Sequence, residues 1–251
     1  MRDYYASRLM FGIITPSANS CVQPDTDLLR PWGVTNQVAR MYSPDLKVNS
    51  DQDFANAIEM LFKSIGPAID QVITCKPDHI ILGISALTVW GGSKKASDQL
   101  KKDMIEKAGG SIDVTIPSEA ILAALKAHGV KKRIAIVEPY YPIIQSKMES
   151  FFTEMGYEVV KINHLKGLQF SEYTRVTKDY LHESIASIDG EGVEALIQFG
   201  ANLPFAGVAD EAEKKLKKPI IAVNIATYWH ALRTCGIQDQ MQGYTKLMSS
   251  F

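Results

Sequence analysis

Residues 80–85 (Ile-Ile-Leu-Gly-Ile-Ser) and 196–202 (Leu-Ile-Gln-Phe-Gly-Ala-Asn) share one pattern, an apolar run followed by a glycine turn. Short apolar runs of this kind are typical of strands buried on both faces of a parallel sheet. Each run takes the same place in a repeated order of strand, proline turn, helix, strand, long helix, strand with a glycine turn, and helix. The repeat predicts two similar α/β lobes.

Seven β-rich runs are predicted strands, at residues 10–15, 37–42, 79–83, 133–137, 158–162, 195–199 and 219–223. Helical periodicity is found at residues 52–74, 94–108, 117–128, 142–155, 178–188, 208–216 and 226–235. Asp51 and Thr177 are candidate N-caps, and glycines stand where several helices are expected to end. The alternation predicts two Rossmann-like (flavodoxin-like) lobes, each with a parallel sheet, related by pseudo-two-fold symmetry.

The first lobe is expected to comprise residues 1–115 plus 225–251, and the second lobe residues 116–224. Ligands of open parallel sheets bind outside the carboxyl ends of the strands. The cleft between the lobes is therefore expected to collect residues 16–21, 83–88, 138–140 and 200–202.

Charge and cysteine content exclude several classes of function. The net charge is −1 and the basic pairs are scattered, so we expect no nucleic-acid partner. Three cysteines without paired or zinc-ligand spacing predict neither disulfides nor a metal site. No apolar run is long enough to span a membrane and no secretory signal precedes the first strand, so we expect a cytoplasmic protein without a membrane partner.

Small polar residues follow two of the predicted strands in the first lobe. Ser17 and Asn19 lie after the first strand, and Ser85 lies after the third. Hydroxyl and amide groups at these positions form either an anion pocket or ordinary turns and caps.

Three residues are candidates for catalysis. Glu138 is a general base if its pKa is raised, and otherwise a local capping residue. Tyr140 is a hydrogen-bond donor, since a phenol is neutral at pH 7. Cys21 lies near a predicted helix start, which favours a thiolate, although a lone cysteine is usually a small buried apolar residue.

Several motifs, in order along the chain, resemble the maleate isomerase and arylmalonate decarboxylase group of the aspartate/glutamate racemase superfamily. They are residues 12–19 (Gly-Ile-Ile-Thr-Pro-Ser-Ala-Asn), Pro117-Ser118, Pro139-Tyr140, Asn202-Leu203 and residues 224–233. The resemblance implies a two-lobed fold with the site in the cleft. It also implies that Ser17, Asn19 and Tyr140 bind the carboxylate of the substrate.

The same resemblance places the two family cysteines at Ile84 and Gly200, so both thiols are absent. Isomerisation and racemisation then lack the thiolate that attacks or deprotonates carbon. Decarboxylation through an enediolate requires mainly an apolar pocket and hydrogen-bond donors. The expected apolar residues are Ile84, Leu87, Val89, Leu203 and Phe205, and the expected substrate-binding residues are Ser17, Asn19, Ile84, Ser85, Tyr140, Gly200, Ala201 and Asn202.

We therefore expect a cofactor-independent enzyme that acts on a small carboxylic or dicarboxylic acid. Its reaction resembles either that of arylmalonate decarboxylase, a lyase, or that of maleate isomerase. The alternative is a catalytically silent protein of the same fold that binds a small carboxylate. The expected binding partner is the acid itself, and the sequence leaves open whether the protein forms a homo-oligomer.

Overall fold

Two parallel four-stranded sheets form the centre of the structure, a computed structural model that describes residues 4–165 and 169–251. The strand orders are β2-β1-β3-β4 and β6-β5-β7-β8, so the two sheets repeat one topology. The first sheet contains β1 (Leu9–Pro16), β2 (Val34–Met41), β3 (His79–Leu82) and β4 (Val114–Thr115). The second contains β5 (Arg133–Glu138), β6 (Glu158–His164), β7 (Ala195–Gln198) and β8 (Ile220–Ala222).

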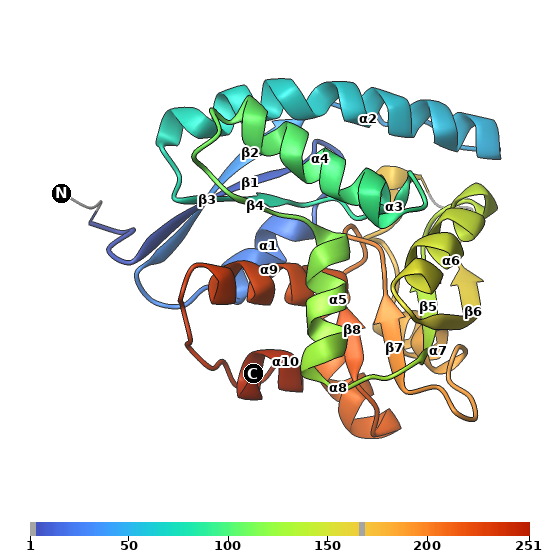
Figure 1. The fold of residues 1–251 in the computed structure, drawn as a ribbon. Helices are drawn as coiled ribbons and strands as arrows, with labels where there is room; N and C mark the ends of the chain where they lie inside the picture. The colour runs from blue at the N-terminus through green and yellow to red at the C-terminus, as the bar shows by residue number, and fades with distance from the viewer. Residues whose placement is uncertain (1–3, 166–168) are drawn as a thin grey trace.

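Helices cover both sheets. They are α1 (Val22–Leu28), α2 (Asp51–Val72), α3 (Ala86–Val89), α4 (Lys94–Lys107), α5 (Pro117–Ala127), α6 (Gln145–Glu154), α7 (Lys178–Ala186), α8 (Ala206–Leu216), α9 (Val223–Thr234) and α10 (Lys246–Ser250). Short 3-10 helices are η1 (Ile73–Cys75), η2 (Pro142–Ile144) and η3 (Phe170–Glu172). Figure 1 shows α2 along the top of the first sheet, with α9 on the other side of that sheet. Helix α9 packs against α5 and also contacts β3, β4 and β8, so it lies where the two sheets approach each other.

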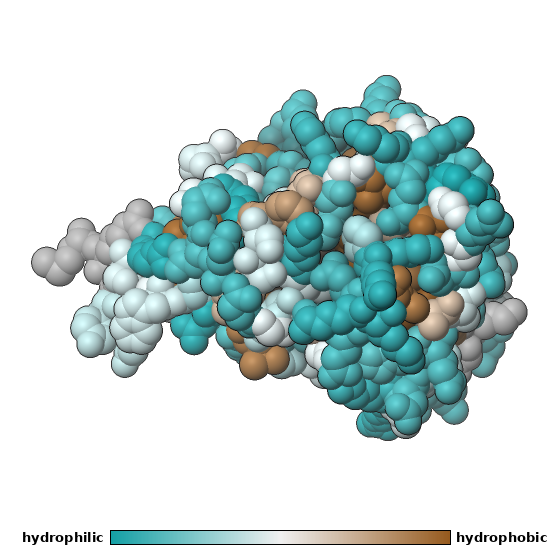
Figure 2. Space-filling model, turned by 90° about the horizontal axis from the view of Figure 1, so that it is seen from below, coloured by the Kyte–Doolittle hydropathy of each residue, from teal (hydrophilic) through white to brown (hydrophobic). Residues whose placement is uncertain are grey.

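The apolar core runs through both sheets. All four residues of β3 and all four of β7 are buried, as expected for central strands covered on both faces. Hydrophilic side chains dominate the face shown in Figure 2, where hydrophobic residues form only small separate patches.

The predicted fold class is confirmed, and each of the seven predicted strands coincides with an observed one. The sequence does not predict β4, which has two residues, or the short helices α3 and α10, whereas α1 begins directly after Cys21, at the expected helix start. The predicted N-cap Thr177 accepts a hydrogen bond from the backbone of Tyr180, as expected. The N-cap of α2 is Ser50 and not Asp51, because the Ser50 hydroxyl accepts the bond from the Asp53 N–H.

No helix among the described residues is long and apolar enough to cross a membrane.

Candidate active site

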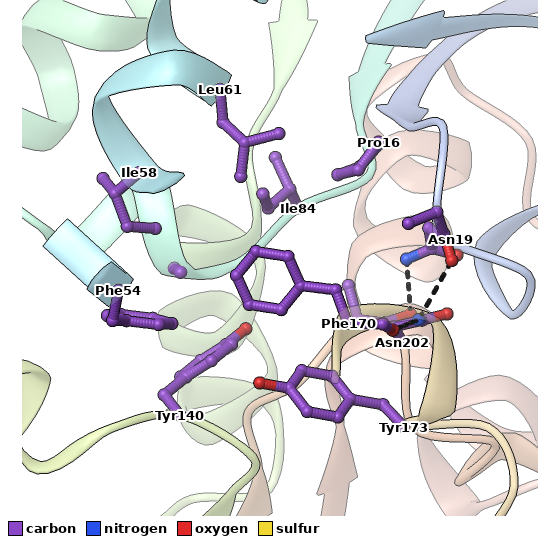
Figure 3. A pocket seen from close by; sticks show the side chains of 13 residues that line it. Pro16, Asn19, Phe54, Ile58, Leu61, Ile84, Tyr140, Phe170, Tyr173 and Asn202 are labelled. Atoms are coloured by element: carbon purple, nitrogen blue, oxygen red, sulfur yellow. Dashed lines mark hydrogen bonds between the residues drawn. The ribbon is translucent and has the colours of Figure 1, made fainter. Parts of the chain in front are cut away.

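A cavity of about 50 Å³ lies at the carboxyl ends of β1, β3, β5 and β7, between the two sheets. A single water needs roughly 10–15 Å³ measured in this way, so the cavity has room for a small ligand. Its apolar wall is formed by Pro16, Phe54, Ile58, Leu61, Ile84 and Phe170. The remaining lining residues are Ala18, Asn19, Ala86, Tyr140, Tyr173, Ala201 and Asn202 (Figure 3).

Hydrogen-bond donors from both sheets meet at Tyr140. Its hydroxyl lies 2.6 Å from the Ser85 hydroxyl, and the backbone N–H groups of Ala86 and Ala201 lie near enough to oppose the rise in its pKa. The Ala201 N–H also lies 3.3 Å from the Ser85 oxygen. Burial raises the pKa of the Tyr140 phenol well above its usual range, so the phenol stays protonated at neutral pH.

This cluster exists because the two turns are equivalent. Ser85 and Ala86 follow β3 of the first sheet, Ala201 follows β7 of the second sheet, and Tyr140 follows β5. Tyr140, Ala86 and Ala201 line the cavity. The fully buried Ser85 does not, and its hydroxyl contacts Tyr140 and the Ala201 N–H. Such a set of donors is suited to a carboxylate or to an oxyanion that forms during a reaction.

Asn19 and Asn202 line the cavity and also join the two sheets. The Asn19 oxygen accepts from the backbone N–H groups of Cys21 and Val22, and its amide nitrogen donates to the Ala201 carbonyl at 3.1 Å. The Asn202 oxygen accepts from the Ser20 N–H at 2.9 Å. Both amides are thus held by protein groups while they face the cavity (Figure 3).

Ser17 lies outside the cavity, in contrast to the expectation from the sequence. Its hydroxyl donates to the Ser43 carbonyl and accepts from the Ser43 N–H, both at 2.9 Å. Its own backbone N–H continues the pairing of the sheet by donating to the Met41 carbonyl. This pairing holds Ser17 at the end of β2, on an exposed side of the loop.

Cys21 is buried and is not part of the cavity wall. Burial and the neighbouring Asp25 raise the pKa of its thiol well above the usual range. The expected thiolate is therefore not favoured, because desolvation outweighs the effect of the short helix α1.

Glu138 is fully buried behind Tyr140 and does not line the cavity. One of its oxygens contacts Nδ1 of His164, and the other accepts the Tyr140 N–H. Burial raises the pKa of Glu138, and the hydrogen bond with His164 partly opposes that shift. The raised pKa was expected for a general base, but in this geometry the carboxyl group holds Tyr140 in place.

The two positions that the sequence resemblance assigns to family cysteines, Ile84 and Gly200, differ in their surroundings. Ile84 lines the cavity. A Cβ atom at Gly200 would lie 2.4 Å from Cδ and 2.8 Å from Cγ of Pro139, so the Pro139 ring fills the space of a side chain there. Ala201 and Asn202, which follow Gly200, line the cavity as the sequence suggested.

The apolar wall differs from the expected one. Leu87, Val89, Leu203 and Phe205 are buried in the core and do not line the cavity, because the short segments after the two turns direct them inward. Their place is taken by Phe54, Ile58 and Leu61 of α2. The spacing of these three residues predicts a buried helix face, but the sequence does not show what that face covers.

Phe170 and Tyr173 were also missed, since their segment carries no helix or strand periodicity. The Asn202 amide fixes this segment by donating to the Phe170 carbonyl at 2.6 Å. Among residues 4–165 and 169–251, no group of three His, Cys, Asp or Glu side chains is placed to hold a metal ion.

Residues 11–248 match the arylmalonate decarboxylase family. No curated protein sequence matches significantly.

The similar solved structures are named as either maleate isomerases or arylmalonate decarboxylases. The maleate cis-trans isomerase of Nocardia farcinica, bound to TRIS, has a TM-score of 0.86 and 17% identity over 96% of this chain and 97% of its own. The maleate isomerase Iso of Pseudomonas putida S16 has a TM-score of 0.81 and 18% identity over 96% and 98%. An arylmalonate decarboxylase structure has a TM-score of 0.74 and 19% identity over 95% and 98%. At these identities the structural likeness establishes the shared fold.

Proposed function

This chain belongs to the arylmalonate decarboxylase family, and on that basis we propose that it removes CO₂ from a small malonate-type acid without a thiolate or a cofactor. One observation carries the proposal. The hydroxyls of Ser85 and Tyr140 and the N–H groups of Ala86 and Ala201 converge beside an apolar wall.

The donor cluster suits the charge that decarboxylation creates. When the bond between the α-carbon and the leaving carboxylate breaks, CO₂ departs and the electron pair moves into the remaining carboxylate to give an enediolate. Tyr140 and the two N–H groups, whose residues line the cavity, then donate to the two enediolate oxygens, and the Ser85 hydroxyl orients Tyr140 by donating to its oxygen. A single preorganised donor of this kind contributes roughly 3 kcal/mol to transition-state stabilisation.

The apolar wall favours the loss of charge at the leaving group. Phe54, Ile58 and Ile84 offer a leaving carboxylate no hydrogen bond, and no Lys or Arg is among the described residues that line the cavity. With the Tyr173 hydroxyl as a single donor and no cation among these described lining residues, a carboxylate is stabilised less well there than in water, whereas neutral CO₂ is tolerated.

A proton must then be added to the α-carbon. Water that enters the cavity is the preferred source, because the single hydroxyl proton of Tyr140 is engaged with the enediolate and burial makes this phenol a weak acid. Cys21 and Glu138 are less suitable than the sequence suggested, since neither lines the cavity.

A second candidate function is the binding of a small carboxylate without catalysis. It is favoured by Ile84 and Gly200, which stand in place of the family cysteines, and by the high pKa of the Tyr140 phenol, which makes it a weak acid. The cavity and its donors serve binding equally well.

Turnover separates the two functions. Malonate, methylmalonate, phenylmalonate and maleate are incubated with the protein and a chelator, and CO₂ release and NMR spectra are recorded. Release of CO₂ from a malonate, with maleate left unisomerised, supports decarboxylation. Saturable binding without product supports the second function, and the absence of both binding and turnover contradicts each of them.

Two variants connect the activity to the donor cluster. Ser85→Ala is expected to lower kcat/KM about 100-fold, because it removes the hydroxyl that orients the Tyr140 donor towards the enediolate. Ser97→Ala is the matched control, since Ser97 forms a buried hydroxyl pair with Ser118 at 2.6 Å, away from the cavity. Equal losses in both variants would show that the effect is structural.

A further inference from the structure

One hydroxyl on the cavity wall has no role in the donor cluster. Tyr173 lines the cavity and its side chain is almost fully buried. Its hydroxyl oxygen is shielded from solvent and has no hydrogen-bond partner among the described residues. A buried hydroxyl without a hydrogen-bond partner is unfavourable. Its presence at the wall of a cavity therefore points to a hydrogen-bond acceptor on the bound ligand.

The position of Tyr173 is fixed by its neighbours. Its ring packs edge to face on Phe170, with 5.8 Å between the ring centroids. Phe170 is held by the Asn202 amide, and Thr174 bonds Ser20 through their hydroxyls at 3.2 Å. Figure 3 shows Tyr173 and Tyr140 on neighbouring parts of the wall. The hydroxyl is therefore held in place before a ligand binds, which favours a specific contact.

The hydroxyl is a donor. Burial raises the pKa of Tyr173 well above its usual range, and the nearby Tyr140 and Glu138 raise it further. The phenol thus carries its proton at neutral pH and offers it to an acceptor.

The first carboxylate of a ligand does not need this donor. Its two oxygens are met by the Tyr140 hydroxyl and by the N–H groups of Ala86 and Ala201, whose residues line the cavity, while the Ser85 hydroxyl is hydrogen-bonded to Tyr140. We propose that Tyr173 is a specificity-determining residue that donates a hydrogen bond to a second oxygen-bearing group of the ligand. This inference rests on the proposed function, because it assumes that the donor cluster receives the first carboxylate.

The preferred ligand is accordingly a small acid with an apolar centre and two oxygen-bearing groups. Methylmalonate and isobutyrate test this preference, since they differ by the replacement of one carboxylate with a methyl group. Binding of each acid is measured by calorimetry for the wild type, for Tyr173→Phe and for Tyr180→Phe. Tyr180 is a partly exposed residue of α7, outside the cavity, and provides the matched control.

The expected result is selective. Tyr173→Phe weakens methylmalonate binding about tenfold, as for the loss of one hydrogen bond to a charged oxygen, and changes isobutyrate binding less than twofold. Tyr180→Phe changes neither. The thermal midpoint of Tyr173→Phe is no lower than that of the wild type, because the hydroxyl has no partner among the described residues of the free protein.

Equal weakening of both acids, or a lower thermal midpoint in Tyr173→Phe alone, overturns the inference, because either result indicates a structural role. Selective binding without CO₂ release supports the role of Tyr173 and contradicts decarboxylation. CO₂ release without the selective effect supports decarboxylation and overturns the role of Tyr173. If the wild type binds neither acid, both proposals are wrong.

Discussion

The side-chain amide of Asn19 donates a hydrogen bond to the backbone carbonyl of Ala201 at 3.1 Å, and so joins the loop after β1 to the turn after β7. The same carbonyl accepts from the Asn224 amide at 3.0 Å, and that amide also donates to Asp25 at 2.7 Å. Two amides thus fix the orientation of the turn after β7. The N–H of Ala201 faces Ser85 and Tyr140 as a result.

Asn19→Asp is expected to destabilise the protein by about 2 kcal/mol and to weaken acid binding. The aspartate keeps the acceptor for the first N–H groups of α1, but it places a carboxylate oxygen against the Ala201 carbonyl. Urea unfolding measures the loss of stability. Asn49→Asp, an exposed substitution with the same charge change, is the control. Equal effects of the two variants would contradict the proposed role of the hydrogen bond between Asn19 and Ala201.

Asp25 is expected to make the protein less stable as the pH rises from about 4 to 6. Burial raises the pKa of its carboxyl group to about 6, although Asn224 opposes the shift. The folded protein therefore binds the proton more tightly than the unfolded chain over this interval, and stability falls by roughly 2–3 kcal/mol as the proton is lost.

Asp25→Asn removes this titration and still offers Asn224 an acceptor. The difference in unfolding free energy between the variant and the wild type should therefore grow in favour of the variant between pH 4 and 6. Parallel curves over this interval would show that Asp25 does not have a raised pKa.

Glu138 is expected to act on the ligand through Tyr140 and not as a base. Glu138→Gln keeps an oxygen for the Tyr140 N–H and a donor for His164, so acid binding and any turnover should stay within about threefold of the wild type. Glu138→Ala leaves both partners unsatisfied and should weaken binding strongly. A collapse of kcat in Glu138→Gln with unchanged binding would identify a base.

Gly200→Ala is expected to destabilise the protein by about 1–3 kcal/mol, because its Cβ meets the ring of Pro139. Gly207→Ala is the matched control. No atom lies within 4 Å of a Cβ at Gly207, which is in α8, so this variant should gain about 0.5–1 kcal/mol. Thermal unfolding compares the two, and an unchanged thermal midpoint in Gly200→Ala would mean that a side chain at this position is tolerated.

Thiol reactivity should separate the three cysteines of the native protein. Cys75 is exposed and should react rapidly with a thiol reagent. Cys235 is half-buried, and burial raises its pKa to about 11, so it should react slowly. Cys21 should react only on unfolding, and Cys21→Ala should bind acid as the wild type does. Mass spectrometry of the labelled peptides measures all three, and rapid labelling of Cys21 would restore it as a catalytic candidate.

Much of the fold was predictable because it follows from local patterns. The apolar runs before Gly83 and Gly200 are fully buried strands, as their composition indicated. Tyr140 and Ser85 were placed at the cleft because both follow strands of parallel sheets. The same rule failed for Ser17, whose backbone continues the pairing with β2 and whose hydroxyl turns to Ser43.

The sequence by itself determined the repeated strand and helix order and the turns that supply Ser85, Tyr140 and Ala201, because periodicity and turn residues are local properties. Only the tertiary structure decided that α2 closes the cavity, that Glu138 lies behind Tyr140 and that Tyr173 faces the ligand space. These relationships join residues far apart in the chain, and they depend on how side chains fill the space between two sheets.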